Sequence, residues 1–150
     1  MTTNKKVYKE NIVLNLNAST KIEVVEKLAE RLFKNGFIDN LAEFIKDVKD
    51  REEHMTTGIG NGIAIPHGKS SSVLESTVIF AKTTEDIEWE SLDDKPVNII
   101  FLLAISKQDA GDKHLRILAD ISGKLMDDDF VYAIKKAGTE KEIEELLSKV

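Results

Sequence analysis

The feature that most limits how this chain can fold is the nearly continuous apolar run at residues 97–105, Val-Asn-Ile-Ile-Phe-Leu-Leu-Ala-Ile. A strand with one buried face alternates apolar and polar residues, whereas a strand covered on both faces is apolar almost throughout. The run is also far too short to cross a bilayer as a helix. We therefore predict a central strand in a sheet that helices cover on both faces.

Two capped helices are expected before this strand. Thr20 and Asn40 each stand three residues before a glutamate, which is the spacing of an N-terminal capping box. Apolar residues recur at helical intervals after both caps and predict helices over residues 20–35 and 40–51. His54 is then expected in the loop that follows the second helix, facing water.

The remaining segments complete an α/β fold. A glycine-rich turn should feed a short buried strand, and the next strand is expected over Ser76 to Lys82. Three helices are expected near the C-terminus, at residues 112–125, 128–137 and 140–149. This order fits neither a regular βαβ alternation nor an all-helical protein, so residues 1–150 are predicted to form one domain with a mixed parallel and antiparallel sheet flanked by helices on both faces.

Composition excludes several kinds of chemistry. The chain has no cysteine, so disulfides, thiolate metal sites and a catalytic thiol are excluded. Its net charge of −6 argues against nucleic-acid binding and against anionic membranes, because both require a positive surface. No apolar signal core follows residues 1–6. We expect a cytoplasmic protein without direct membrane insertion.

His67 is the strongest candidate for a reactive residue. Pro66 fixes the backbone before it and Gly68 removes side-chain bulk after it, so the ring should be held rigidly with one face open. A phosphorus atom can approach one ring nitrogen in line while a backbone carbonyl holds the other. The alternative is a histidine that only forms part of a turn.

The glycine-rich segment before His67 has two interpretations. Gly58, Gly60, Asn61 and Gly62 can offer backbone N–H groups to anionic oxygens, and Gly68 is a further candidate for backbone or support of the same site. The same glycines can simply be tight-turn residues. Neither a Walker-type phosphate loop nor a dinucleotide fingerprint is present at the required spacing.

His114 and Arg51 are the second and third candidates. His114 falls in the first turn of a predicted helix, where the helix dipole favours an anion. Arg51 closes the second helix on its inward side, and its guanidinium suits bidentate contact with phosphate oxygens. The alternatives are a core histidine that packs and hydrogen-bonds, and a surface ion pair of Arg51 with a neighbouring carboxylate.

Three segments together carry a specific resemblance to a known family, the enzyme IIA components of the fructose/mannitol class of the sugar phosphotransferase system. They are Arg51-Glu52, the run Thr57-Gly-Ile-Gly-Asn-Gly-Ile-Ala-Ile-Pro-His-Gly68, and His114-Leu-Arg-Ile-Leu-Ala119. The resemblance covers nearly the whole chain. Residues 87–92 and 124–127 look more like the fructose branch than the nitrogen-regulatory branch.

The resemblance implies a phosphotransferase that works through a phosphohistidine. The family's phosphorylated histidine matches His67, its second active-site histidine matches His114, and its phosphate-site arginine matches Arg51. In the family, the phosphoryl group comes from the carrier HPr and passes to a cysteine of a sugar-specific IIB partner, and a membrane IIC component moves the sugar. No cofactor is implied. His54 departs from the uncharged residue expected there.

Two other functions are considered. A regulatory, nitrogen-type IIA protein would also carry phosphate on His67 but would control transporters or kinases. A metal-binding protein or metal-dependent hydrolase would have to combine His54, His67 and His114 with carboxylates, and the spacings of these histidines match no compact metal-ligand motif. The residues alone identify neither the sugar, the oligomeric state nor a fusion to IIB and IIC.

Overall fold

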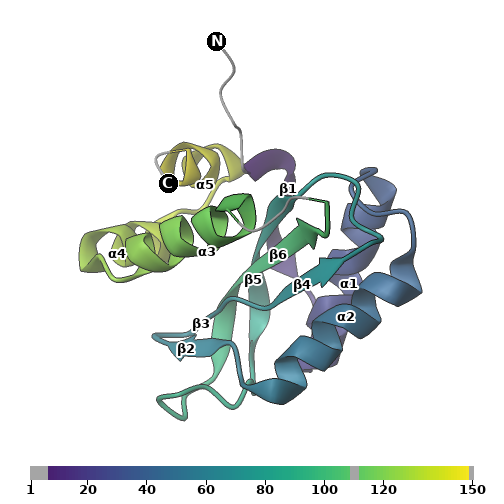
Figure 1. Cartoon of the computed structure of the whole chain (residues 1–150). Coiled ribbons are helices and arrows are strands. Elements are labelled where there is room, and N and C mark those ends of the chain that lie inside the picture. The colour runs from purple at the N-terminus through teal and green to yellow at the C-terminus, as the bar shows by residue number, and fades with distance from the viewer. Residues whose placement is uncertain (1–6, 109–111, 149–150) are drawn as a thin grey trace.

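The computed structural model describes residues 7–108 and 112–148. Six strands and five helices follow one another in these residues (Figure 1). Their bounds, in chain order, are β1 (Val7–Leu16), α1 (Lys21–Lys34), α2 (Leu41–His54), β2 (Gly58–Gly60), β3 (Ile63–Ala64), β4 (His67–Ser70), β5 (Thr77–Ile87), β6 (Val97–Ser106), α3 (Asp112–Leu125), α4 (Asp128–Lys136) and α5 (Glu140–Leu147).

All six strands belong to one mixed sheet. The strand order is β1-β5-β6-β3-β2, and β4 also pairs with β6. β5 is antiparallel to β6, whereas β3 and β4 are parallel to β6 and β1 is parallel to β5. The predicted mixed sheet is confirmed. Of the described strands only β6 pairs with β4, so β4 forms an edge of the sheet.

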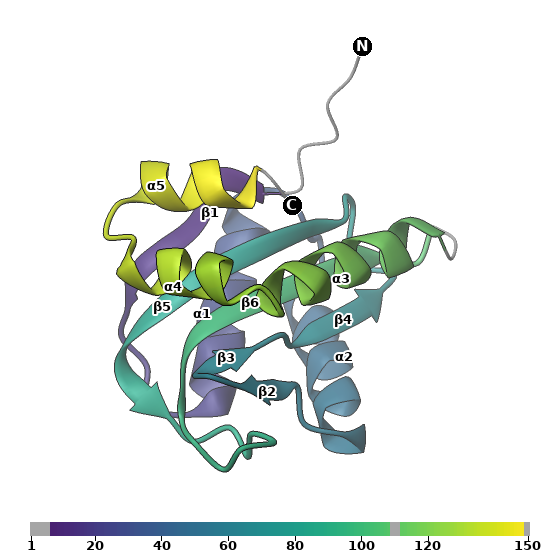
Figure 2. The same cartoon turned by 90° about the vertical axis from the view of Figure 1, so that its left-hand side faces the viewer.

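Helices cover the sheet on both faces, as the apolar run of β6 predicts (Figures 1 and 2). Ile100, Leu102 and Ala104 point into the core beneath α1 and α2. Phe101 and Leu103 point into the opposite core, with α3, α4 and α5. Successive residues of a strand point to opposite faces, so a strand buried twice requires this continuous run of apolar side chains.

The helix starts follow from local chemistry. The side chains of Thr20 and Asn40 accept hydrogen bonds from the backbone N–H groups of Glu23 and Glu43, at 3.2 and 3.0 Å. The predicted caps of α1 and α2 are therefore confirmed. The predicted end of α2 is wrong, because the helix continues past residue 51 to His54.

The N-terminal strand β1 is an addition to the predicted elements. It pairs in parallel with β5, and its register shifts between Val7 and Ile12 and again between Val13 and Leu16. These irregularities disturb the strict alternation by which a half-buried strand is normally detected.

Candidate functional site

The site begins with a close approach between β4 and α2. Gly68 lies against Val48 of α2: a Cβ atom added at Gly68 would lie 2.7 Å from Val48 Cγ2 and 3.3 Å from Val48 N. A glycine therefore lets the edge strand pack directly on the helix. One helical turn after Val48, the same face of α2 carries Arg51, so this packing brings Arg51 beside the start of β4.

The start of β4 is His67, and both of its ring nitrogens are engaged. Arg51 Nε donates to His67 Nε2 at 3.1 Å, and His67 Nδ1 lies 3.1 Å from the carbonyl oxygen of Ile65. Because an arginine Nε–H can only donate, Nε2 is the acceptor and the ring proton sits on Nδ1, which donates to the Ile65 carbonyl. The ring is thus fixed in one tautomer, with the Nε2 lone pair directed toward Arg51.

The pairing register shows which face of the sheet His67 occupies. His67 pairs with Leu103 of the parallel strand β6, and Leu103 points into the core under α3, α4 and α5. His67 therefore faces the side covered by α3, whose first turn carries His114. The side chain of His114 lies outside the described residues, so its role stays a prediction. Arg51 belongs to α2, which packs on the opposite face of the sheet, and its guanidinium nevertheless reaches the ring of His67.

A buried network anchors the end of α2 to the segment before His67. Glu52, whose side chain is 9% exposed, accepts hydrogen bonds from the hydroxyl and the backbone N–H of Thr57 at 2.6 and 2.8 Å, and it pairs with Lys21 at 3.2 Å. Trp89 is fully buried and donates its indole N–H to the Thr57 hydroxyl at 3.2 Å. The Thr57 carbonyl accepts from the N–H of Ile65 at 3.0 Å. The network thus continues to the residue whose carbonyl holds His67.

Sequence patterns do not point to Glu52 and Thr57 as site residues, although both belong to the segments that carry the family resemblance. A glutamate five residues before a threonine across a helix end gives no recognisable local signal. Trp89, within residues 87–92 that also carry the resemblance, is a fully buried core residue.

The glycine-rich segment, which the sequence predicts to be a turn, begins with the short strand β2 at Gly58–Gly60, and only Asn61 and Gly62 form the turn into β3. Gly60, Asn61 and Gly62 all have positive φ angles, of 106°, 58° and 77°. The Asn61 N–H donates to Asp93 at 3.1 Å, and the Gly58 N–H donates to the Thr56 hydroxyl at 3.2 Å. Both N–H groups therefore have hydrogen-bond partners within the chain. Phosphate contact through the glycine segment stays a prediction.

His54 lies in the last turn of α2 rather than in a loop. Its side chain is exposed, as expected, and its Nδ1 lies 2.8 Å from the carbonyl oxygen of Asp50. Within the described residues, no group of three or more His, Asp or Glu side chains is arranged to hold a metal ion. In the same part of the chain, no helix has the length and apolar character needed to span a membrane.

The fold and the site define a class: a one-domain α/β protein with an arginine-paired histidine at the sheet edge. The chain belongs to the family described as "Phosphoenolpyruvate-dependent sugar phosphotransferase system, EIIA 2", which matches residues 6–150. This is the phosphotransferase family that the sequence resemblance indicated.

Two relatives illustrate the family. The fructose-specific EIIA component of Haloferax volcanii is 32% identical over 141 residues, which cover 94% of this chain and 91% of that protein. The 2-O-alpha-mannosyl-D-glycerate-specific EIIABC component of Escherichia coli is 31% identical over 137 residues. That match covers 91% of this chain but only 21% of the longer relative.

Solved structures share the fold over nearly the full length. The nitrogen regulatory protein IIA-Ntr of Neisseria meningitidis matches with a TM-score of 0.85 and 26% identity, over 95% of this chain and 96% of that one. The mannitol enzyme IIA of Escherichia coli, solved in complex with phosphorylated mannitol enzyme IIB, matches with a TM-score of 0.81 and 25% identity, over 97% and 99% of the two chains.

Proposed function

We propose that residues 1–150 act as a cytoplasmic phosphoryl carrier in which His67 Nε2 is the atom that is phosphorylated. The observation that carries this proposal is the arrangement of the ring: Nδ1–H donates to the Ile65 carbonyl, and Nε2 accepts from Arg51. A fixed tautomer leaves the lone pair of one defined nitrogen available for attack on phosphorus.

The reaction follows from this geometry. His67 Nε2 attacks the phosphorus of phosphohistidine on the donor; the donor P–N bond breaks as the P–Nε2 bond forms, and each ring keeps the proton on its other nitrogen. The phosphorylated ring of His67 gains positive charge, which strengthens the hydrogen bond from Nδ1–H to the Ile65 carbonyl. Arg51 turns from Nε2 to the phosphoryl oxygens and neutralises their charge.

The partners are proposed from the family. HPr is the donor, and a cysteine of a sugar-specific IIB component is the acceptor, so that P–Nε2 breaks as a P–S bond forms. The related mannitol enzyme IIA has been solved with phosphorylated enzyme IIB, which supports such a partner. A IIC component would then move the sugar, for which fructose is proposed because a relative is fructose-specific. His114, on the helix that covers the face of His67, is proposed to contact the same phosphoryl group.

A regulatory role is the second candidate. The likeness to the nitrogen regulatory protein of Neisseria meningitidis, with a TM-score of 0.85, supports it. A regulatory protein would take phosphate from HPr without passing it to a IIB cysteine. Mixing the phosphorylated chain with the purified IIB domain from the same organism separates the two: rapid loss of label to IIB supports transport, and retained label supports regulation.

The phosphoryl-carrier proposal is tested with labelled phosphoenolpyruvate, enzyme I and HPr. The wild-type chain should take up acid-labile, base-stable label, and His67→Ala should take up none. Arg51→Ala and His114→Ala should fold normally but accept phosphate about a hundredfold more slowly, because each removes stabilisation of the transition state and leaves the nucleophile. His54→Ala is the matched histidine control and should transfer at the wild-type rate. Label that persists in His67→Ala would contradict the proposal.

A further inference from the structure

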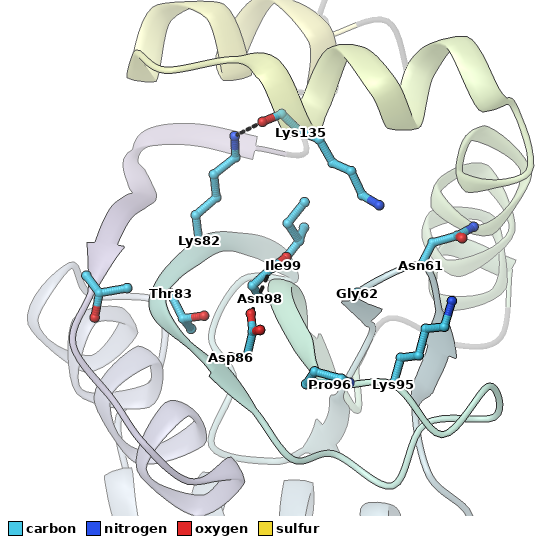
Figure 3. Close-up of a pocket in the computed structure, with 11 residues that line it drawn as sticks. Asn61, Gly62, Lys82, Thr83, Asp86, Lys95, Pro96, Asn98, Ile99 and Lys135 are labelled. Carbon is cyan, nitrogen blue, oxygen red and sulfur yellow. Dashed lines mark hydrogen bonds between the residues drawn. The ribbon is translucent and has the colours of Figure 1, made fainter.

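A hollow lies between the C-terminal end of α4 and the outer end of the β5–β6 hairpin (Figure 3). Its volume is about 630 Å³, within the range of sites that bind small molecules. The β2–β3 turn closes one side of it through Asn61 and Gly62. Neither His67 nor Arg51 lines this hollow.

The side chains that line the hollow carry an excess of positive charge, whereas the whole chain carries a net charge of −6. The Asp93 carboxylate lies beside this lining, where it accepts hydrogen bonds from the backbone N–H groups of Asn61 and Lys95 at 3.1 Å each. Lys82, Lys95 and Lys135 line the hollow together with a single carboxylate, that of Asp86. Within the described residues, none of these three ammonium groups has a carboxylate within 4 Å. A concave surface with an excess of positive charge attracts small anions.

Lys82 is hydrogen-bonded to the backbone segment to which Lys135 belongs. Lys82 Nζ donates to the carbonyl oxygens of Lys135 and Ala137, at 3.1 and 2.6 Å, and so binds the C-terminal end of α4 to β5. Burial lowers the pKa of Lys82, and the nearby charge of Glu142 opposes that change. Figure 3 shows the side chain of Lys135 extending from this anchored segment into the hollow.

The other lining groups indicate what kind of anion fits. Asn98 donates its amide N–H to Asp86 at 3.3 Å, which engages that carboxylate at the wall. The remaining polar groups include the amide of Asn61, and the apolar contribution is limited to Pro96 and Ile99. None of the lining residues, all of which are described, is aromatic. A nucleotide base would therefore have no ring on which to stack, whereas a polar chain of hydroxyl groups would find amide partners.

We infer that this hollow binds a small sugar monophosphate, with its phosphate held by Lys95 and Lys135 and its hydroxyl groups against the amides of Asn61 and Asn98. Each lysine carries a compact charge on a flexible side chain, which can move to contact a phosphate. The amides can hydrogen-bond the hydroxyl groups of a sugar phosphate, which free phosphate lacks. The inference concerns binding to the unphosphorylated chain and does not depend on phosphoryl transfer by His67.

The test is a titration of the full chain carrying His67→Ala, followed by ¹H–¹⁵N NMR and calorimetry. The probes are fructose 1-phosphate, fructose 6-phosphate, inorganic phosphate and fructose. A sugar phosphate should shift the backbone amides of Asn61, Gly62 and Asn98, inorganic phosphate should bind more weakly, and fructose should not bind.

Two matched double variants then distinguish binding at this hollow from attraction by the overall charge of the protein. Lys95→Gln with Lys135→Gln should weaken sugar-phosphate binding at least about tenfold, because both phosphate contacts are lost. Lys34→Gln with Lys141→Gln removes the same charge from exposed positions elsewhere and should leave the affinity unchanged.

Three results would overturn the inference. The first is the absence of shifts at the Asn61, Gly62 and Asn98 amides with millimolar sugar phosphate, including the case in which shifts are confined to the surroundings of Arg51. The second is equal weakening in the two double variants, which would show attraction by overall charge alone. The third is equal affinity for inorganic phosphate and sugar phosphate, which would show that the sugar is not recognised.

Discussion

The geometry of the site depends on a glycine, Gly68, which has no side chain. Gly68 allows β4 to touch α2, and this contact places Arg51 next to His67. A valine within a helix has one strongly preferred χ1 rotamer, so Val48 cannot turn its methyl group away without cost. Its backbone nitrogen, 3.3 Å from the added Cβ, cannot move unless the helix moves.

Gly68→Ala should therefore lower the free energy of unfolding by about 1–3 kcal/mol, as is usual for overpacking, and should also slow phosphate uptake by His67. Urea unfolding and the labelled-phosphate assay measure the two effects. Gly123→Ala is the control: this glycine is exposed in α3 with nothing within 4 Å of its added Cβ, so the variant should gain about 0.5–1 kcal/mol in helix stability. A Gly68→Ala protein as stable and as fast as wild type would contradict the account.

The carboxylate of Glu52 joins the end of α2 to Thr57, the residue before β2. Both of its oxygens accept hydrogen bonds from Thr57, and one also pairs with Lys21. The Thr57 carbonyl in turn bonds the N–H of Ile65, whose carbonyl holds the His67 proton. This connection predicts that Glu52 positions the ring of His67.

Glu52→Gln replaces one acceptor oxygen with an N–H₂ group that faces a donor. The free energy of unfolding should fall by about 1–3 kcal/mol, the usual cost of a buried polar group without a partner. Phosphate uptake should slow, and the ¹⁵N shifts of His67 should show a mixture of tautomers, which a purely structural loss would not produce. Glu53→Gln changes the same charge at an exposed neighbouring position and should leave all three measurements unchanged. A variant with an unchanged tautomer and rate would refute the positioning role.

Sequence patterns predict those elements whose signals lie within a few neighbouring residues. The caps at Thr20 and Asn40 and the strand β6, which is buried on both faces, are predictable in this way. The His67 segment was also recognisable, since Pro66 and Gly68 flank it. The Gly68–Val48 contact and the Glu52 network were not predictable, because each depends on how α2 packs against distant strands. β1 was missed, and its two register shifts disturb the expected alternation.

At the scale of the whole molecule, several turns and helix starts depend on ionised carboxylates. Hydrogen bonds from the backbone N–H and hydroxyl groups of Ser19 lower the pKa of Glu23 at the start of α1. The backbone N–H of Gly138 and the hydroxyl of Thr139 lower the pKa of Glu142 in the same way at the start of α5. Each carboxylate binds a proton less readily in the folded chain than in the unfolded one.

The free energy of unfolding should therefore decrease as the pH is lowered, because folding lowers the pKa of both carboxyl groups. The stabilisation from Glu23 and Glu142 is fully present above their unfolded pKa, near the ordinary value of 4.5, and is lost as pH falls through their lower folded pKa. Urea unfolding between pH 7 and pH 3 should show this loss, and Glu23→Gln with Glu142→Gln should be less stable than wild type at pH 7 and approach it in acid. Glu26→Gln with Glu145→Gln removes the same charge from exposed side chains and should keep the wild-type pH dependence. If both double variants followed the same curve, net charge rather than the two capping carboxylates would control the acid sensitivity.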